Sequence, residues 1–437
     1  MYSMYIGKKY LEIYNSKNKH LSSKEFFDEV YFPLFFNNER YMQLINNSPF
    51  DQLCKHKEKK NTKPQERIKC LKKFHDDILE SPKPHMGIAI GFPAGDITET
   101  TSGQVSNIEI KYLPDDIYCS WIGSGFGIGL QGGFVILIDH PKILELIAEG
   151  WKYYRKFLTD TPNLKPYQIY TWNGKWLSHV LSKKYKSTNP LENFFIEFET
   201  ELDKKTNEIK SVIPTQSWIN IIFSLSRQFH NETMMAYVFS LSQMNTTVGF
   251  IHLNLKEVKR EIDMYDSLFG VFEGFEDVKQ LDDFYDTEHS FVKACQMGSI
   301  GLRAIEPKHL REYFPGEKMP KLSKDIKTEI NFKIYLSWIR AMLNSQELYN
   351  FANELSTGLH KFSSSFVRGK TTNKQLVVSV LESKSKKDFI QSLTRILEED
   401  SSYGDLFDRV VKEILKMPND NFPLFVTLLR FKYAMIQ

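Results

Sequence analysis

Apolar side chains return at intervals of three and four residues through the last third of the chain, with polar residues between them. This spacing places the apolar positions on one face of an α-helix. Breaks at Gly, Pro and Ser divide the pattern into six predicted helices, at 330–344, 347–362, 373–382, 387–399, 403–416 and 422–436. Because almost no β-branched run interrupts them, we expect an all-helical bundle over residues 320–437.

The first part of the chain shows two different patterns. Residues 1–80 look helical, and Ser22 and Glu25 have the spacing of a capping box ahead of an aromatic run. Over residues 86–140, short apolar and β-branched runs are broken by Gly, Pro and Asp. Such runs are typical of strands, so this segment is predicted to be β-rich.

Helical spacing returns over residues 142–185, with a tight turn predicted at Asn173-Gly174. A buried helix is expected over 218–244, followed by a strand at VGFIHLNL. The fold class is therefore α+β. We expect an irregular mixed body over residues 1–305, a linker that contains Pro315-Gly316, and then the helical bundle.

The stretch WIGSGFGIGLQGG, which begins at Trp121, departs furthest from ordinary globular sequence. Glycine at this density indicates backbone with positive φ, or a place where another group approaches the main chain closely. It does not match a dinucleotide or P-loop fingerprint, so no nucleotide cofactor is expected. A glycine-rich hairpin with bulges is one interpretation. The other is a loop that meets nucleic acid or a partner, through Gly123, Gly125, Gly127, Gly129 and Gln131.

Bulk composition is that of a folded globular protein. The 437 residues are 41% hydrophobic and 25% charged, with a net charge of +3, which argues against a uniformly basic nucleic-acid binder. The four cysteines are scattered and lack zinc-site spacing, as in a reduced cytoplasmic protein. The longest apolar runs are too short to span a membrane, so no membrane is expected among its partners.

Two local basic clusters lie in the predicted bundle, at helix junctions. They are Arg368, Lys370 and Lys374, followed by Lys384, Lys386 and Lys387. One interpretation is a pair of solvated loops. The alternative is a surface that contacts the phosphate backbone of single-stranded or duplex nucleic acid.

No convincing catalytic or metal-ligating pattern stands out. Asp282, Asp283, Asp286 and Glu288 could supply carboxylates for a divalent metal, but they belong to a long acidic stretch that is typical of a solvated face. Asp139-His140 closes an apolar run, where a turn with a capping Asp before Pro141 explains both residues. No catalytic residue, metal site or cofactor is therefore predicted.

The order of these parts resembles the large subunit of type I CRISPR effector complexes (Cascade), in which an irregular α+β body precedes a helical bundle. The likeness is in the layout, in the glycine-rich stretch, in the segment QMNTTVGFI with Asn245, and in the C-terminal segment that begins SKKDFIQSLTRILEED. The resemblance implies a non-enzymatic subunit that binds the motif flanking a target DNA and helps to hold the separated strands. Guide RNA would read the rest of the target, and other protein subunits would be partners.

Two other functions remain open from the residues alone. One is a metal-dependent DNA endonuclease of a microbial defence system, which would use the acidic stretch or Asp139. The other is a protein-interaction scaffold that binds no nucleic acid.

Overall fold

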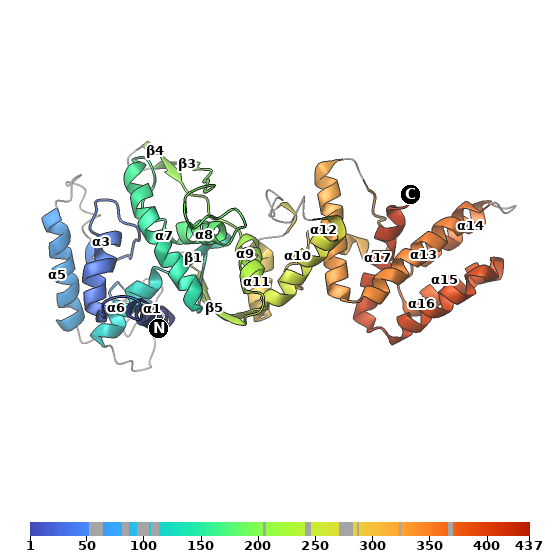
Figure 1. Ribbon diagram of the computed structural model, residues 1–437, viewed down its shortest axis with the longest axis horizontal. Helices are drawn as coiled ribbons and strands as arrows, with labels where there is room; N and C mark the ends of the chain where they lie inside the picture. Colours follow the sequence, from blue (N-terminus) through green and yellow to red (C-terminus); the bar gives the residue numbers. More distant parts are fainter. Residues whose placement is uncertain are drawn as a thin grey trace. The chain divides into compact units, whose positions relative to one another are not determined.

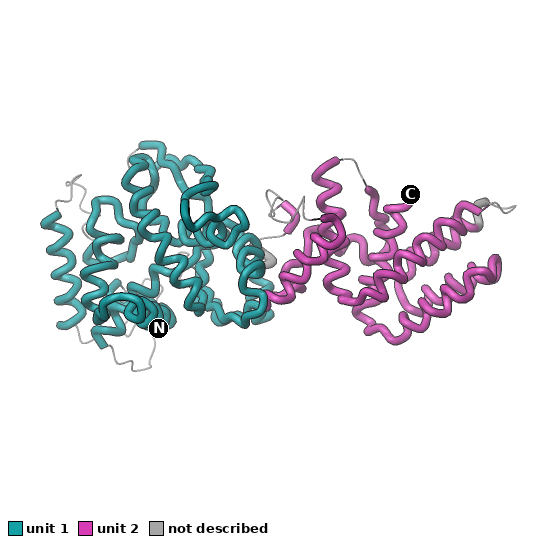
Figure 2. The backbone as a smooth tube through the Cα atoms, viewed as in Figure 1, with its two compact units in different colours: residues 1–253, 291–299 teal, residues 254–290, 300–437 magenta. Residues whose placement is uncertain are grey.

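The computed structural model describes residues 1–51, 64–80, 87–93, 105, 113–203, 207–240, 246–270, 283–285, 288–322, 325–365 and 370–437. Figure 1 shows the course of the chain, which divides into two compact units (Figure 2). Unit 1 holds residues 1–253 and 291–299, and unit 2 holds residues 254–290 and 300–437. No described helix is both long enough and apolar enough to cross a membrane.

Unit 1 combines helices with an antiparallel sheet. The helices are α1 (Tyr2–Asn15), α2 (Ser23–Phe26), α3 (Phe32–Phe35), α5 (Pro64–Glu80), α6 (Pro114–Ser124), α7 (Pro141–Asp160), α8 (Ile169–Val180), α9 (Trp218–Phe229) and most of α11 (Glu288–Gln296). The sheet has the order β1-β2-β5-β6-β7, with β1 (Ile128–Leu130), β2 (Phe134–Ile138), β5 (Met234–Ser240), β6 (Thr246–Leu253) and β7 (Ser299–Ile300). A separate hairpin pairs β3 (Glu199–Asp203) with β4 (Glu208–Val212).

Strand β5 is central to this sheet, with Ile136 opposite Val238 on one side and Ile251 opposite Ala236 on the other. Successive side chains of a strand point to opposite faces. Met234, Ala236 and Val238 are buried, whereas the residues between them are only half-buried. One face of β5 therefore belongs to the core of unit 1 and the other lies near its surface.

Helices α1 and α6 pack backbone against backbone. A Cβ atom on Gly7 would lie 1.9 Å from the carbonyl oxygen of Cys119, and one on Gly123 would lie 1.7 Å from that of Ser3. No side chain fits at either glycine. Trp121 of α6 is buried, and so is Trp151, whose ring centroid lies 6.1 Å from that of Tyr10 of α1.

Among its described residues, unit 2 is mostly helical, apart from a largely non-helical stretch over 300–325. It contains α10 (Leu255–Phe269), η6 (Leu310–Tyr313), α12 (Ile326–Leu343), α13 (Gln346–Ser364), α14 (Lys370–Leu381), α15 (Lys386–Glu399), α16 (Gly404–Lys416) and α17 (Phe422–Ala434). Side chains cap the N-termini of three of these helices, with Asp325 accepting from the backbone of α12, Ser345 from α13 and Ser385 from α15. Their apolar faces meet in a core that includes Trp338, Phe389 and Phe425.

The α+β class and the helical C-terminal region are confirmed, and each of the six predicted helices matches one of α12 to α17. The capping box of Ser22 and Glu25 is also present at the start of α2. Residues 254–290 and 300–305, which we expected in the first body, group with unit 2. Helix α10 packs on α12 there.

Three local predictions are wrong. Asn173-Gly174 lies inside α8 instead of a tight turn, where the Asn173 side chain donates to the carbonyl oxygens of Gly125 and Gly127. Residues 234–240 form strand β5 instead of continuing a helix, because β2 and β6 supply hydrogen-bond partners on both sides. Residues 114–124 form α6 instead of strands, with Pro114 and two Asp residues in the first turn, which favour a helix start.

Candidate functional site

The glycine-rich stretch is divided among several elements of unit 1. Gly123 belongs to α6, Gly125 caps the C-terminus of that helix, and Gly129 lies in β1. These residues and Gly127 are all buried. A Cβ on Gly127 would lie 2.8 Å from the ring of Tyr170, and one on Gly129 would lie 3.2 Å from the Tyr170 Cβ.

The groups that lie close to these glycines are therefore backbone atoms and aromatic rings of the protein itself. The interpretation as a single loop is therefore wrong, while contact of these residues with nucleic acid or a partner stays a prediction. Only the turn between β1 and β2 resembles the predicted hairpin, with positive φ of 81° at Gly132 and 76° at Gly133. Gln131 is half-buried there and donates its backbone N–H to the Gln216 carbonyl oxygen at 3.1 Å. Asn245 lies outside the described residues.

The second basic cluster is largely engaged with the protein itself. The Lys384 ammonium lies 3.5 Å from the carboxylate of Glu317, and Lys386 donates to the carbonyl oxygen of Met417. Lys387 is exposed. Two of the three lysines therefore have structural contacts.

The first basic cluster lies at the other end of α14. Arg368 is outside the described residues, and Lys370 begins the helix. Lys374 is exposed, one turn further along. Since a helix rises about 1.5 Å per residue, this cluster and the Lys384 cluster are separated by roughly the length of α14. They do not form one continuous patch.

A wider basic segment appears when the neighbouring helix is included. Residues 355–381 contain Lys361, Arg368, Lys370 and Lys374 and no Asp or Glu. The Lys361 and Lys374 side chains are exposed, and neither forms an ion pair or hydrogen bond with another residue that the structure describes. We call residues 355–381 the basic segment.

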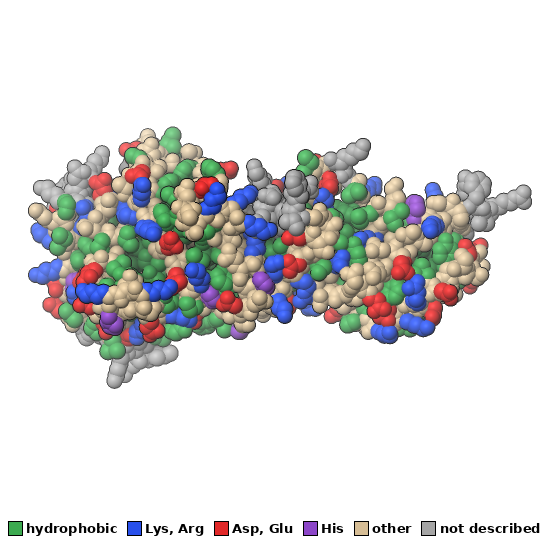
Figure 3. Space-filling model, viewed as in Figure 1, with side chains coloured by type: hydrophobic (Ala, Val, Ile, Leu, Met, Phe, Trp, Pro, Cys, Tyr) green, Lys and Arg blue, Asp and Glu red, His purple; other side chains and the backbone are tan. Residues whose placement is uncertain are grey.

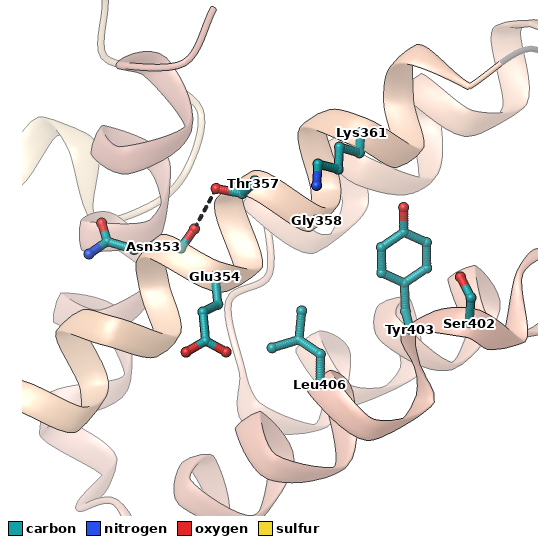
Figure 4. A pocket seen from close by; sticks show the side chains of 8 residues that line it. All are labelled: Asn353, Glu354, Thr357, Gly358, Lys361, Ser402, Tyr403 and Leu406. Atoms are coloured by element: carbon teal, nitrogen blue, oxygen red, sulfur yellow. Dashed lines mark hydrogen bonds between the residues drawn. The ribbon is translucent and has the colours of Figure 1, made fainter.

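Two hollows of unit 2 lie along the basic segment. The first, of about 500 Å³, separates α13 from the start of α16 (Figure 4). Figure 4 shows Lys361 and Tyr403 along it, together with Asn353, Glu354, Thr357, Gly358, Ser402 and Leu406. The Glu354 carboxylate in this hollow pairs with Arg409 at 2.9 Å. The hollow therefore combines a lysine that has no ion-pair partner among the described residues with a carboxylate whose charge is compensated.

The second hollow, of about 330 Å³, is lined by α13, α14 and α17 and includes Lys374, His360 and Arg430. Arg430 is 1% exposed, and its guanidinium donates to the carbonyl oxygens of Leu381 and Tyr313. Burial lowers the pKa of Arg430 to about 10, which leaves it charged at neutral pH. The described lining of this hollow contains no Asp or Glu.

Asp139, His140 and Asp283 have structural partners. The Asp139 carboxylate pairs with Lys9 and accepts a hydrogen bond from Tyr5, and His140 contacts Glu232 at 2.5 Å. Asp283 pairs with Lys327 at 2.9 Å, while Asp282 and Asp286 lie outside the described residues. Among the described residues, no three His, Cys, Asp or Glu side chains come together as metal ligands would.

Sequence reasoning missed an aromatic surface on the sheet of unit 1. Tyr237 of β5 and Phe250 of β6 are opposite one another, with ring centroids 5.2 Å apart. Tyr2 of α1 contacts both rings. The signal was present as aromatic residues at alternate positions of MMAYVFS, but buried apolar residues fill the positions between them and hide the alternation.

In the space-filling view, Lys and Arg side chains are spread over both units among acidic ones, so no single basic surface dominates that face (Figure 3). No family model matches the chain, and no curated protein or solved structure matches it either. The functional conclusion therefore rests on the residues described above.

Proposed function

We propose that this chain is a non-catalytic, nucleic-acid-binding subunit of a CRISPR-type antiviral effector complex that acts in the cytoplasm. In this role it would recognise the flank of a target DNA and stabilise the separated strands. Its partners would be DNA, guide RNA and the other protein subunits. The layout described above, an α+β body followed by a helical bundle, is compatible with this function.

The basic segment is the observation that carries the proposal. It spans 27 residues without a carboxylate, at the end of α13 and through α14. Lys361 and Lys374 have no ion-pair partner among the described residues, so their charge is available to phosphates. Phosphate binding by such lysines releases condensed counterions, which gives affinity on any sequence. Specificity for a target flank must come from other contacts.

A pair of charge-matched double variants tests this role. Lys361→Ala with Lys374→Ala removes the two exposed lysines of the basic segment, whereas Lys412→Ala with Lys416→Ala removes two lysines of α16 that pair within their own helix. We expect the first variant alone to weaken binding of single-stranded and duplex DNA on every sequence. The slope of log affinity against log salt should fall by roughly 0.7–0.9 for each phosphate that the variant no longer neutralises.

The measurement is a mobility-shift series on the purified chain and on its assembled complex, across salt concentrations. Equal weakening by the two variants would mean that net charge alone acts, and would contradict the assignment of the basic segment. A chain that binds no nucleic acid and co-purifies with proteins but no RNA would be a scaffold. Mg²⁺-dependent cleavage of DNA would favour the endonuclease.

A further inference from the structure

Five aromatic rings form one connected surface on unit 1. Tyr237 contacts Phe250 at 5.2 Å and Phe239 at 6.0 Å between ring centroids. Tyr2 lies 5.1 Å from both Tyr237 and Phe250 and stacks on Tyr5 at 5.6 Å. We call these five residues the aromatic face.

This surface is not part of the core. On β5 the buried positions are Met234, Ala236 and Val238, so Tyr237 and Phe239 are on the opposite side of the strand. Phe250 is 57% exposed and Tyr5 is 44% exposed, which is unusual for large rings in mutual contact. Ring surface that could have been buried is left open to solvent.

The two strands of the aromatic face carry no acidic residue that would repel an anionic partner. Residues 233–256, which include both strands and their connection, contain no Asp or Glu. Two carboxylates lie near Tyr5. Asp139 is paired with Lys9 and accepts a hydrogen bond from the Tyr5 hydroxyl, and Glu12 is the second. A phosphate backbone could therefore approach β5 and β6 without meeting a carboxylate from either strand.

We propose that the aromatic face stacks unpaired bases of a single-stranded nucleic acid. Bases have flat apolar surfaces and polar edges. The face offers rings for the first. For the second it offers the Tyr237 and Thr247 hydroxyls, which lie 3.1 Å apart and as a hydrogen-bonded pair still have one O–H donor and acceptor lone pairs. Exposed aromatic residues on neighbouring strands bind bases in this way with little dependence on sequence, because every base has a π-face. This inference rests on the proposed function, which supplies the nucleic acid, and assigns a second site in unit 1.

The test compares an oligothymidylate with a strand of equal length and charge that consists of abasic residues. Binding of each to the full chain is measured for wild type, Phe250→Ala, Phe250→Leu, Phe250→Tyr and Phe195→Ala. Phe195, 86% exposed and outside the aromatic face, is the matched control. Circular dichroism and the unfolding midpoint confirm that each variant is folded, as expected for exposed positions.

Wild type and Phe195→Ala should prefer the strand with bases about tenfold, and Phe250→Ala should lose most of that preference. Phe250→Leu should lose it too, although it keeps apolar surface, and Phe250→Tyr should restore it. Abasic binding and the salt slope should not change, since phosphate contacts remain elsewhere.

Three outcomes would overturn the inference, and they are distinguishable. If neither strand binds wild type, the proposed function fails as well. If both strands bind equally well and Lys361→Ala with Lys374→Ala weakens both, only the aromatic face is refuted. If Phe250→Ala instead abolishes self-association in sedimentation, the face belongs to a contact with a second copy of the chain.

Discussion

Glu261 is the most unusual titratable residue of unit 2. It lies on α10 with no solvent exposure, and its Oε1 atom accepts the Tyr285 hydroxyl at 2.6 Å. Burial raises the pKa of its carboxyl from 4.5 to about 8, an effect that the Tyr285 hydrogen bond opposes only in part. Glu261 is therefore protonated in the folded protein at neutral pH.

The pKa of Glu261 is higher in the folded state than in the unfolded state, so the folded protein binds the carboxyl proton more tightly. The contribution of this proton to the stability of the folded state is fully present below about pH 4.5 and is lost as pH rises through about 8. We predict that the free energy of unfolding falls over this window, by up to about 1.4 kcal/mol per pH unit. Glu261→Gln keeps an acceptor for Tyr285 and cannot ionise. Its unfolding free energy should change much less with pH and should exceed that of wild type at pH 8.

Urea unfolding at pH 5, 6, 7 and 8 checks this prediction. Asp263→Asn is the control, because it removes an exposed carboxylate from the same helix, one that pairs with Lys259. A wild-type curve as flat as that of Glu261→Gln would show that the carboxyl is not held neutral.

Single residues also mark the limit of what the sequence can predict. A glycine that is needed because a distant backbone segment packs against it looks the same in the sequence as a glycine in an exposed loop. Gly123 contacts Ser3, more than a hundred residues away, and no residue near Gly123 in the sequence indicates that contact. Of the exposed lysines of the basic segment, Lys374 was named from the sequence, whereas Lys361 was missed because it lies alone within a predicted helix.

At the scale of elements, the C-terminal helices were predictable because their signals are local. The apolar period and the caps both lie within the helix that they specify. Strand β5 was not, because a short apolar run fits a helix or a strand equally well until its neighbours are known. Hydrogen bonding to β6 and to β2, which is distant in the sequence, decides that this run forms a strand.

The start of α15 provides a test at this scale. The Ser385 hydroxyl accepts from the backbone N–H of Asp388 at 3.1 Å. Ser385→Ala leaves the Asp388 N–H without a side-chain acceptor and should lower the free energy of unfolding by about 1 kcal/mol. Ser385→Asp provides another acceptor and should keep most of the wild-type free energy of unfolding. Chemical denaturation of both variants measures the difference. If both variants lose the same free energy of unfolding, the loss comes from other contacts of the Ser385 hydroxyl and not from capping of α15.

At the scale of the whole molecule, composition and pattern indicated two parts, but not which part α10 joins. Helix α10 lies far before the predicted bundle in sequence, and it packs on α12. Trp338 of α12 donates its indole N–H to the carbonyl oxygen of Leu302 at 3.0 Å. The core of unit 2 thus depends on residues that precede the six helices.

We predict that a fragment of residues 254–437 unfolds at a higher urea concentration than one of residues 320–437. The shorter fragment lacks α10 and Leu302, so it exposes apolar surface of α12 and leaves the Trp338 N–H without its acceptor. Both should give strongly helical circular dichroism. Identical midpoints would mean that the bundle is complete without α10.

The backbone contact between α1 and α6 has a consequence for synthesis. Helix α1 leaves the ribosome before α6, yet the carbonyl group and glycine on which it packs belong to residues 119–123. At about 5–20 residues per second, translation needs roughly 5–20 seconds to supply them. Throughout that interval α1 can contact α2 through Tyr10, Tyr14 and Phe26, but it lacks the α6 backbone on which it packs most closely. A nascent chain that stalls before α6 therefore presents an incompletely buried α1, the kind of surface that chaperones and proteases recognise.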